Sequence, residues 1–449
     1  MTGRVGLIGE NSIEYIDKLL DIWNHGDCAV LIDWRIPYQA AIEMMRDANV
    51  SVCYAEQKWL SNTFSDAPND IEFISFNRNS NSAELVPHEI YNKFCESYSH
   101  DEAVVIYSSG TTGRAKGIIL SHYAINTNAD AIIDYMRPTK HDCLYIAKTI
   151  SHSSTITGEL LVALKTRTPL VIAPTIVPPR FVLHAINEFN ISILCLNPTL
   201  LKMYTEACKN TNYDLETLKT IYVSGEILND RVYREAHEVF QGSDIYNVYG
   251  LSEAGPRVTA QRKDCCKSNS VGRAIKDATI VIVDSNGDIV RACEHGIIHV
   301  LTPSLFSGYV FGANKFSSLY KGYLNTGDIG YWDENKELHI INRVDDVIFI
   351  GAHKIYPSDI SNKIIEISNV EECVIRNINF HGKNILSCLY LSSIEISSQI
   401  KRKLKKELLQ YEIPKIFIRN SFIPKTKTNK IDLNKVDKII INKLERILT

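Results

Sequence analysis

Short apolar runs alternate with segments of helical spacing over the first third of the chain. Residues 4–9, 28–33 and 50–56 are rich in aliphatic side chains, which is typical of strands, whereas residues 12–26 and 38–49 repeat their apolar positions with a helical period. Consecutive strands that are separated by helices pair in parallel, because each helix carries the chain back along the sheet. The pattern therefore predicts a parallel sheet covered by helices.

The same alternation returns in the middle of the chain, from about residue 143. Helical spacing recurs at residues 180–190 and 198–210. Around these helices we predict short strands at residues 143–148, 169–174, 191–197, 220–225 and 244–250. Together with the first third, these elements predict a large α/β body.

The pattern then changes to antiparallel β structure, followed by a separate small domain. Residues 278–290 and 331–342 each place a turn sequence between two strand-like runs, which predicts hairpins. From Val344 onward, short strands mix with two helical patterns over about a hundred residues, a normal domain size. The predicted fold class is α/β, with an N-terminal body of parallel sheets and a β-rich subdomain over 1–343 and a small mobile C-terminal α+β domain over 344–449.

Composition narrows the class of protein. A formal net charge of -3 argues against a dedicated nucleic-acid binder, which is usually strongly basic. The 11 cysteines form no CxxC pair and no cysteine–histidine cluster with zinc spacing, and their usage fits a reducing compartment. No apolar run reaches the length of a membrane-spanning helix, about 18 residues. We therefore expect a cytoplasmic protein without a membrane span. We also expect a monomer or a homodimer, and the sequence leaves both open.

One segment, YSSGTTGRAKG at residues 107–117, concentrates residue types that bind phosphate. Its glycines let backbone N–H groups turn toward an anion, its hydroxyl groups can donate hydrogen bonds, and its lysine supplies a positive charge. The spacing is not that of the common nucleotide loop, in which glycine directly precedes the lysine and a helix follows. A flexible surface hairpin loop is the alternative. The predicted phosphate-binding residues are Ser108, Ser109, Gly110, Thr111, Thr112, Gly113 and Lys116.

This loop resembles the phosphate loop of the adenylate-forming superfamily, which comprises acyl- and aryl-CoA synthetases, adenylation domains of peptide synthetases, and luciferases. Ala115 stands where the family usually has proline. Further motifs follow in the family's order over nearly the whole chain, so the chain is identified as a member. The resemblance implies an enzyme that uses ATP and Mg²⁺ to convert a carboxylic acid to an acyl-adenylate and then transfers the acyl group to a thiol.

The segment NVYGLSEAG at residues 247–255 resembles the family's YGxTE motif. The resemblance implies that Glu253 holds Mg²⁺, a cation that prefers oxygen ligands, and that Tyr249 stacks near the adenine. The segment TIYVSGEIL resembles the loop that lines the adenine and acyl pocket. The nucleotide-binding residues carried over from these two motifs are Asn247, Tyr249, Gly250, Ser252, Ser224, Gly225 and Glu226.

Two later motifs resemble parts of the family that contact the ribose and the thiol. In YLNTGDIGYW, Asp328 corresponds to the aspartate that accepts hydrogen bonds from the ribose, and Arg343 is expected to face the ribose or a phosphate. Asp345 matches the hinge about which the small domain turns. Gly351 lies in a stretch similar to the one beside the pantetheine channel, where glycine allows close backbone approach.

The tail segment SFIPKTKTNKIDLNKV resembles the family's last signature and aligns Lys430 with its catalytic lysine. Asn429 replaces the family's glycine, and asparagine tolerates left-handed backbone better than most residues. The resemblance implies that Lys430 bridges the carboxylate and α-phosphate oxygens, where two anions must meet.

The class of acid is inferred from the segment ISHSSTITGEL and its neighbours. No residue clearly matches the aspartate that holds the α-ammonium group in amino-acid-activating relatives, so we expect an aryl or alkyl acid without an α-amino group. His152, followed by small polar residues, resembles the aryl- and alkyl-acid activators. A packed histidine without a substrate role is the alternative.

Two thiol acceptors are compatible with the sequence: coenzyme A, which we favour, and the phosphopantetheine of an acyl carrier protein. The basic run KRKLKKEL either docks such a partner or forms the solvated face of a helix with Ile400, Leu404 and Leu408 inward, and we predict the second. The alternative functions are a stand-alone enzyme that loads a carrier protein in natural-product biosynthesis and a non-catalytic relative.

Overall fold

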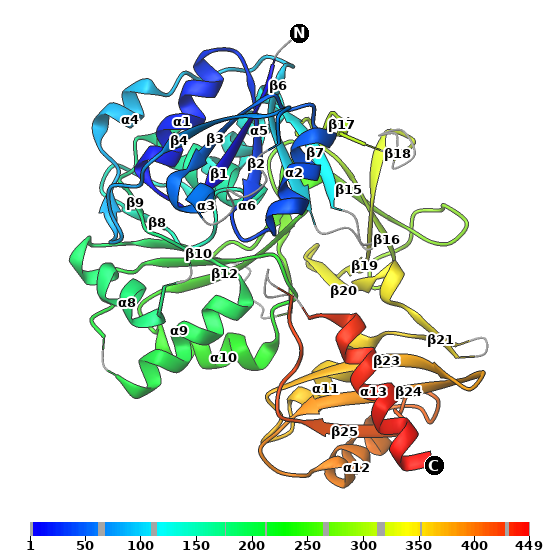
Figure 1. Cartoon of the computed structure of the whole chain (residues 1–449). Coiled ribbons are helices and arrows are strands. Elements are labelled where there is room, and N and C mark those ends of the chain that lie inside the picture. The colour runs from blue at the N-terminus through cyan, green and yellow to red at the C-terminus, as the bar shows by residue number, and fades with distance from the viewer. Residues whose placement is uncertain are drawn as a thin grey trace. The chain divides into compact units, whose positions relative to one another are not determined.

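The computed structural model describes residues 3–61, 68–108, 115–175, 177–211, 213–263, 269–311, 319–350, 353–426 and 431–448. The chain divides into two compact units (Figure 1). The first unit takes in residues 1–293, 298–326 and 332–339, and the second takes in residues 294–297, 327–331 and 340–449. A functional boundary between residues 343 and 344 stays a prediction.

The first sheet of the first unit is built around the N-terminal strand. Its strands are β1 (Arg4–Gly9), β2 (Cys28–Asp33), β3 (Val52–Glu56), β4 (Glu72–Phe76), β6 (Glu102–Ser108), β7 (Lys116–Ser121) and β17 (Gly308–Tyr309). The order is β17-β7-β6-β2-β1-β3-β4, and the strands from β6 to β4 run parallel. β6 and β7 form an antiparallel hairpin that pairs Ser108 with Lys116, so the two ends of the predicted phosphate loop lie side by side.

The second sheet is larger and also parallel at its centre. Its strands are β5 (Glu84–Leu85), β8 (Leu144–Ile146), β9 (Leu170–Ile172), β10 (Ile193–Leu196), β11 (Thr220–Val223), β12 (Asp244–Gly250), β13 (Arg257–Ala260) and β14 (Arg273–Ala274). The order is β14-β13-β12-β11-β10-β8-β9-β5, in which β12 through β9 run parallel. The carboxyl ends of these parallel strands therefore share one edge, the usual place for a ligand in such sheets.

Helices α8 (Pro179–Glu188), α9 (Pro198–Asn210) and α10 (Asp230–Val239) lie along the second sheet (Figure 1). Side chains such as Val182, Leu201 and Tyr233 pack with Leu194 and Ile221 of the strands in one buried cluster. Both helix starts carry residues that favour a helix N-terminus. α8 begins with proline, and at the start of α9 the Asn197 side chain accepts a hydrogen bond from the Leu200 N–H.

The first sheet has its own helices, and a mixed helical run connects strands β8 and β9 of the second sheet. α1 (Ile13–Asn24) is capped by Ser12, which accepts a hydrogen bond from the Tyr15 N–H at 3.1 Å. The remaining helices are α2 (Tyr38–Asp47), α3 (Gln57–Ser61), α4 (His88–Lys93), α5 (His122–Met136), α6 (Ser153–Thr155), the π-helix η1 (Ile156–Leu161), α7 (Val162–Thr166) and the 3₁₀ turn η2 (Ser252–Ala254). No described helix combines the length and apolar character needed to cross a membrane.

The predicted antiparallel region forms a five-stranded sheet. Its strands are β15 (Thr279–Val283), β16 (Gly296–Leu301), β18 (Leu319–Tyr320), β19 (Tyr323–Trp332) and β20 (Leu338–Arg343). The hairpin predicted over 331–342 corresponds to β19 and β20, which pair. The hairpin predicted over 278–290 is reduced to β15 and a single bridge between Val283 and Ile289.

The second unit packs helices on both faces of a three-stranded sheet. Its elements are the 3₁₀ turn η4 (Val344–Asp346), β21 (Ile348–Ile350), β22 (His353–Ile355), α11 (Pro357–Ile365), β23 (Glu372–Phe380), β24 (Lys383–Leu391), α12 (Ser397–Glu407), β25 (Ile416–Asn420) and α13 (Leu433–Leu448). Alternate residues of β24 face opposite sides, so Cys388 packs with α11 and α12 whereas Leu389 packs with α13. Ile400 and Leu404 of α12 are fully buried. This confirms the prediction that the basic run forms the solvated face of a helix whose apolar side chains point inward.

Candidate functional site

A tight turn between β12 and β13 forms the centre of the candidate site. A Cβ at Gly250 would lie 1.9 Å from the Pro256 carbonyl oxygen, so only glycine fits the close approach of the two strands. The side chain of Asn128, from α5, holds the far end of the turn: it accepts a hydrogen bond from the Arg257 N–H at 2.9 Å and donates one to the Arg257 carbonyl at 2.9 Å. The turn is therefore locked to a helix of the same unit.

Glu253 and Lys116 meet at one tyrosine. The Tyr309 hydroxyl donates a hydrogen bond to Glu253 Oε1 at 3.1 Å, and the Lys116 ammonium lies 5.8 Å from the centre of the same ring. Tyr309 belongs to β17, which pairs with β7 directly beside the phosphate loop. The structure thus brings the predicted metal ligand and the predicted phosphate-binding lysine to one place.

The segment around His152 lies against the same turn. Ser153 Oγ and Ser252 Oγ are 2.7 Å apart, within hydrogen-bond distance. Burial acts to raise the pKa of Asp33, but hydrogen bonds from Arg35 outweigh burial, and His152 adds a smaller effect, so the pKa is lowered. His152 is exposed and lies close enough to the Asp33 carboxylate to act on it.

The remaining predicted residues of β11 and β12 differ in what they can offer a ligand. Asn247 is buried and donates its side-chain N–H to the Ser270 carbonyl at 3.1 Å, so its amide supports the turn region. Ser224 is buried at the carboxyl end of β11, and Gly225 follows with a positive φ of 99° and open space at its Cα. Glu226 is exposed and accepts a hydrogen bond from the Thr199 hydroxyl at 3.3 Å.

Asp328 and Arg343 form a pair within the second unit. Arg343 Nε lies 3.8 Å from Asp328 Oδ1, and Asp328 is largely buried whereas the arginine side chain is exposed. Asp345 is exposed in η4, two residues after Arg343. The pair joins predicted ribose-binding residues of two consecutive strands, β19 and β20, and their contact with a ribose stays a prediction.

Several predicted residues lie outside the described residues, so the structure says nothing of them. They are Ser109, Gly110, Thr111, Thr112, Gly113, Gly351 and Lys430. The cysteine pair at 265–266 falls outside as well. Ser108, Lys116, Tyr249, Gly250, Ser252 and Glu253 are described and are half-buried, as expected for side chains at the edge of a site.

Sequence reasoning missed three positioning residues, Asn128, Tyr309 and Ser153. Each lies at least 50 residues from the motif it supports, and each contact is made through tertiary packing. The available signal was weak: an asparagine inside an apolar helix pattern suggests a buried hydrogen bond without identifying its partner.

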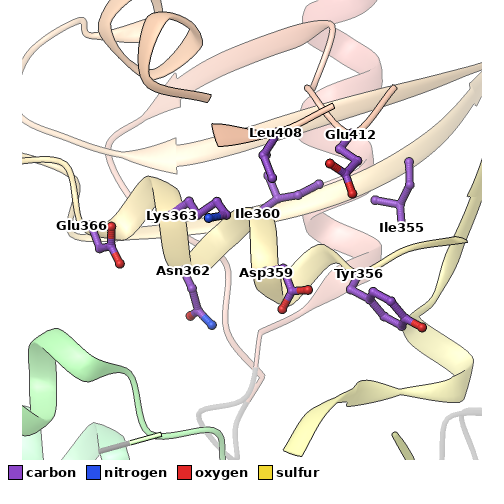
Figure 2. A pocket seen from close by; sticks show the side chains of 9 residues that line it. All are labelled: Ile355, Tyr356, Asp359, Ile360, Asn362, Lys363, Glu366, Leu408 and Glu412. Carbon is purple, nitrogen blue, oxygen red and sulfur yellow. The ribbon is translucent and has the colours of Figure 1, made fainter. Parts of the chain in front are cut away.

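Figure 2 shows a separate hollow in the second unit, between α11 and residues 408–412. Three acidic side chains, Asp359, Glu366 and Glu412, and one cation, Lys363, contribute to its lining. Burial raises the pKa of Asp359. This hollow contains none of the residues predicted from the sequence, so we do not include it in the candidate site.

Comparison with known proteins identifies the class. Residues 2–310 match the family described as AMP-binding enzyme, which is more than half of the chain. The chain belongs to the AMP-binding enzyme family. This match confirms the resemblance found in the motifs.

Individual relatives agree with this assignment. The chain is 23% identical to an indoleacetate–CoA ligase of Aromatoleum aromaticum, over 98% of this chain and 88% of that protein. It is 25% identical to a long-chain-fatty-acid–CoA ligase of Bacillus subtilis, over 74% of this chain and 60% of that protein. The ATP-bound structure of MatB from Rhodopseudomonas palustris matches with a TM-score of 0.86 at 20% identity, over 100% of this chain and 90% of that chain, which confirms the predicted fold class.

Proposed function

We propose that the protein is an acid–thiol ligase that activates a small carboxylic acid with ATP and transfers the acyl group to coenzyme A. The observation that carries the proposal is the meeting of Lys116, Tyr309 and Glu253 in a chain of the AMP-binding enzyme family. The two relatives with CoA-ligase names favour coenzyme A as the acceptor. The carrier-protein thiol remains the alternative acceptor.

The residues at the site fit a magnesium–nucleotide complex. Mg²⁺ is usually held by one or two carboxylates together with phosphate oxygens and water, and Glu253 supplies one carboxylate whose orientation is fixed by the Tyr309 hydroxyl. No cluster of three or more metal-ligating side chains occurs among the described residues. When bound, the ion would neutralise phosphate charge.

The first half-reaction joins two anions, so we assign the chain's residues to charge neutralisation and positioning. A carboxylate oxygen attacks the α-phosphorus, the bond to the bridging oxygen breaks, and pyrophosphate leaves. Lys116 and the loop from Ser108 to Gly113 would hold the leaving phosphates. Lys430 would lie between the carboxylate and the α-phosphate, and Asp328 with Arg343 would orient the ribose.

The second half-reaction replaces AMP by a thiol. The sulfur attacks the acyl carbon, the bond to the phosphate oxygen breaks, AMP leaves, and the thiol proton passes to water. We propose that Asp345 acts as the hinge of the small domain for this step and that Gly351 borders the pantetheine channel. His152 would contact the acid. A cytoplasmic location and a monomeric or homodimeric state stay predictions.

Pyrophosphate exchange over a panel of aryl and alkyl acids tests the first step. We expect exchange with at least one acid, and a loss of about 100-fold or more in Lys430→Ala. No exchange with any acid would contradict the enzyme assignment and favour a non-catalytic relative. Parallel thioester assays with coenzyme A and with a holo-carrier protein then identify the acceptor, because turnover with the carrier alone would overturn coenzyme A.

A further inference from the structure

Three ionisable side chains are buried together behind the contact between Ser153 and Ser252. Lys148 follows β8, Glu159 lies in η1, and Arg257 begins β13. Glu159 is 0% exposed, Arg257 is 3% exposed, and the Lys148 side chain is 11% exposed. Lys148 Nζ lies 2.9 Å from Glu159 Oε1, so the group, here called the buried triad, holds two cations and one acid.

The buried triad is not internally satisfied. Within the described part of the chain, Arg257 Nε and the Thr157 hydroxyl are buried without a hydrogen-bond partner, and the Glu159 carboxylate has no partner besides its ion pair with Lys148. A buried polar group without a partner costs about 1 to 3 kcal/mol, so natural proteins rarely accumulate several at one place unless water or a ligand completes them. Tyr135 lies beside Arg257, which acts on it through its charge and through a side-chain hydrogen bond.

The buried triad borders the segment predicted to contact the acid. Lys148 Nζ lies 3.5 Å from Ser154 Oγ, and the neighbouring Ser153 contacts Ser252 of the turn. A Cβ at Gly158 would lie only 3.3 Å from an Arg257 guanidinium nitrogen, so the charged group packs closely against the backbone of η1. The incompletely hydrogen-bonded groups of the buried triad therefore lie next to the acyl end of the proposed site.

We propose that the acyl pocket selects a carboxylic acid that bears a second carboxylate, which Arg257 and Lys148 hold at the floor of the pocket. The inference rests on the proposed function, because it names the class of acid for that site. A purely apolar acid would leave Arg257 desolvated and unpaired, and a cationic acid would be repelled by two positive charges. A carboxylate supplies both the missing charge and acceptor oxygens in the planar geometry that a guanidinium binds.

The titration of Glu159 strengthens the charge argument. Burial raises the pKa of Glu159 to about 7, while Lys148 and Arg257 act in the opposite direction. Near neutral pH the carboxyl is therefore ionised only in part, and it neutralises less than one of the two positive charges. The buried triad therefore keeps a net positive charge.

Matched pairs of acids provide the test. Pyrophosphate exchange is measured with butanedioate, hexanedioate and benzene-1,4-dicarboxylate, each beside its monomethyl ester, which adds one methyl group and removes the second charge. We expect at least one diacid to exceed its ester by about 50-fold or more in kcat/KM, since a site built to bind a polar group strongly rejects the analogue that lacks it. Equal or better use of every ester would overturn the inference.

Variants assign the preference to the buried triad. Arg257→Met should reduce the diacid preference to about tenfold or less, and Arg257→Lys should restore part of it, because lysine keeps the charge but not the planar geometry. The control is Lys165→Met, which removes a buried cation of α7 that pairs with Asp130 outside this region, and it should leave the preference unchanged. An unchanged preference in folded Arg257→Met would contradict the role of Arg257.

A binding measurement separates this inference from the proposed function. Calorimetric titration of each diacid and its ester into the wild-type protein needs no turnover. Tighter binding of a diacid without exchange would support the buried triad and overturn the ligase assignment. Exchange with monocarboxylic acids, together with no preference for a diacid in binding or turnover, would leave the ligase assignment intact and overturn the dicarboxylate inference.

Discussion

At the scale of single residues, Glu159 makes stability depend on pH. Its pKa is raised by burial to about 7, above its usual value of 4.5, so the folded state favours the protonated carboxyl. The stabilisation that this carboxyl contributes is fully present below its pKa in the unfolded chain. It is lost as the pH rises through the pKa of the same carboxyl in the folded protein. The relevant window therefore extends from the unfolded pKa up to about pH 7.

We expect Glu159→Gln to remove this loss. Relative to the wild type, the variant should gain about 1 to 3 kcal/mol in free energy of unfolding between about pH 5 and pH 8. Urea denaturation at several pH values measures the difference. Glu188→Gln, on the exposed side of α8, is the control and should follow the wild type. A parallel pH profile for both variants would contradict a raised pKa at Glu159.

Tyr309 offers a second prediction at this scale, because it fixes the Glu253 carboxylate without touching the substrate in the proposed mechanism. Tyr309→Phe keeps the ring beside Lys116 and removes only the hydroxyl. Loss of such a supporting hydrogen bond weakens metal affinity by about 10-fold or more. The Mg²⁺ concentration for half-maximal exchange should rise accordingly, with kcat near the wild-type value at saturating Mg²⁺. A purely structural role would lower kcat at every Mg²⁺ concentration instead.

At the scale of elements, helix α5 supports the turn between β12 and β13 through Asn128. Asn128→Ala should destabilise the protein by about 1 to 3 kcal/mol, because it leaves the buried Arg257 N–H without its partner. It should also raise KM for ATP about tenfold by shifting the turn. Asn126→Ala is the matched control: Asn126 is buried on the same helix and bonds the Ser97 carbonyl, so stability should fall without a change in KM.

The hairpin of β6 and β7 gives another prediction at this scale. Ala115 precedes Lys116 where the family has proline, and proline would restrict the unbound loop. Ala115→Pro should lower KM for ATP by about two- to fivefold, which corresponds to the usual effect of a compatible proline. ATP-dependent exchange rates measure the change. An unaltered KM would mean that the neighbouring residues already fix the approach to the lysine.

The sequence predicted elements well where a periodic pattern met a clear boundary. Strand β1, helix α1 and strand β2 agree with their predicted ranges, because buried faces leave a period of two or 3.6 in the chain. The π-helix η1 was not predicted, since a single wider turn depends on packing and has no period of its own. Likewise, Lys148 and Arg257 are separated by more than a hundred residues, so their meeting could not be inferred from spacing.

At the scale of the whole molecule, the proposed mechanism assigns the two half-reactions to different residues of the small domain. Lys430→Ala should lose about 100-fold or more in adenylate formation yet convert a supplied acyl-adenylate to thioester within about tenfold of the wild-type rate. Gly351→Trp should show the reverse, because a bulky side chain would obstruct the pantetheine channel. Single-turnover assays of each half-reaction measure both. Equal losses in both half-reactions for either variant would contradict the division.

The contacts of Tyr309 also make it a built-in spectroscopic reporter. Its ring lies beside Lys116 and its hydroxyl bonds Glu253, so binding at either group changes the electric field at the same aromatic side chain. A fluorinated tyrosine at this one position would give a ¹⁹F resonance that responds to phosphate on one side and to the cation on the other. Occupancy of the site could then be followed by NMR without any turnover.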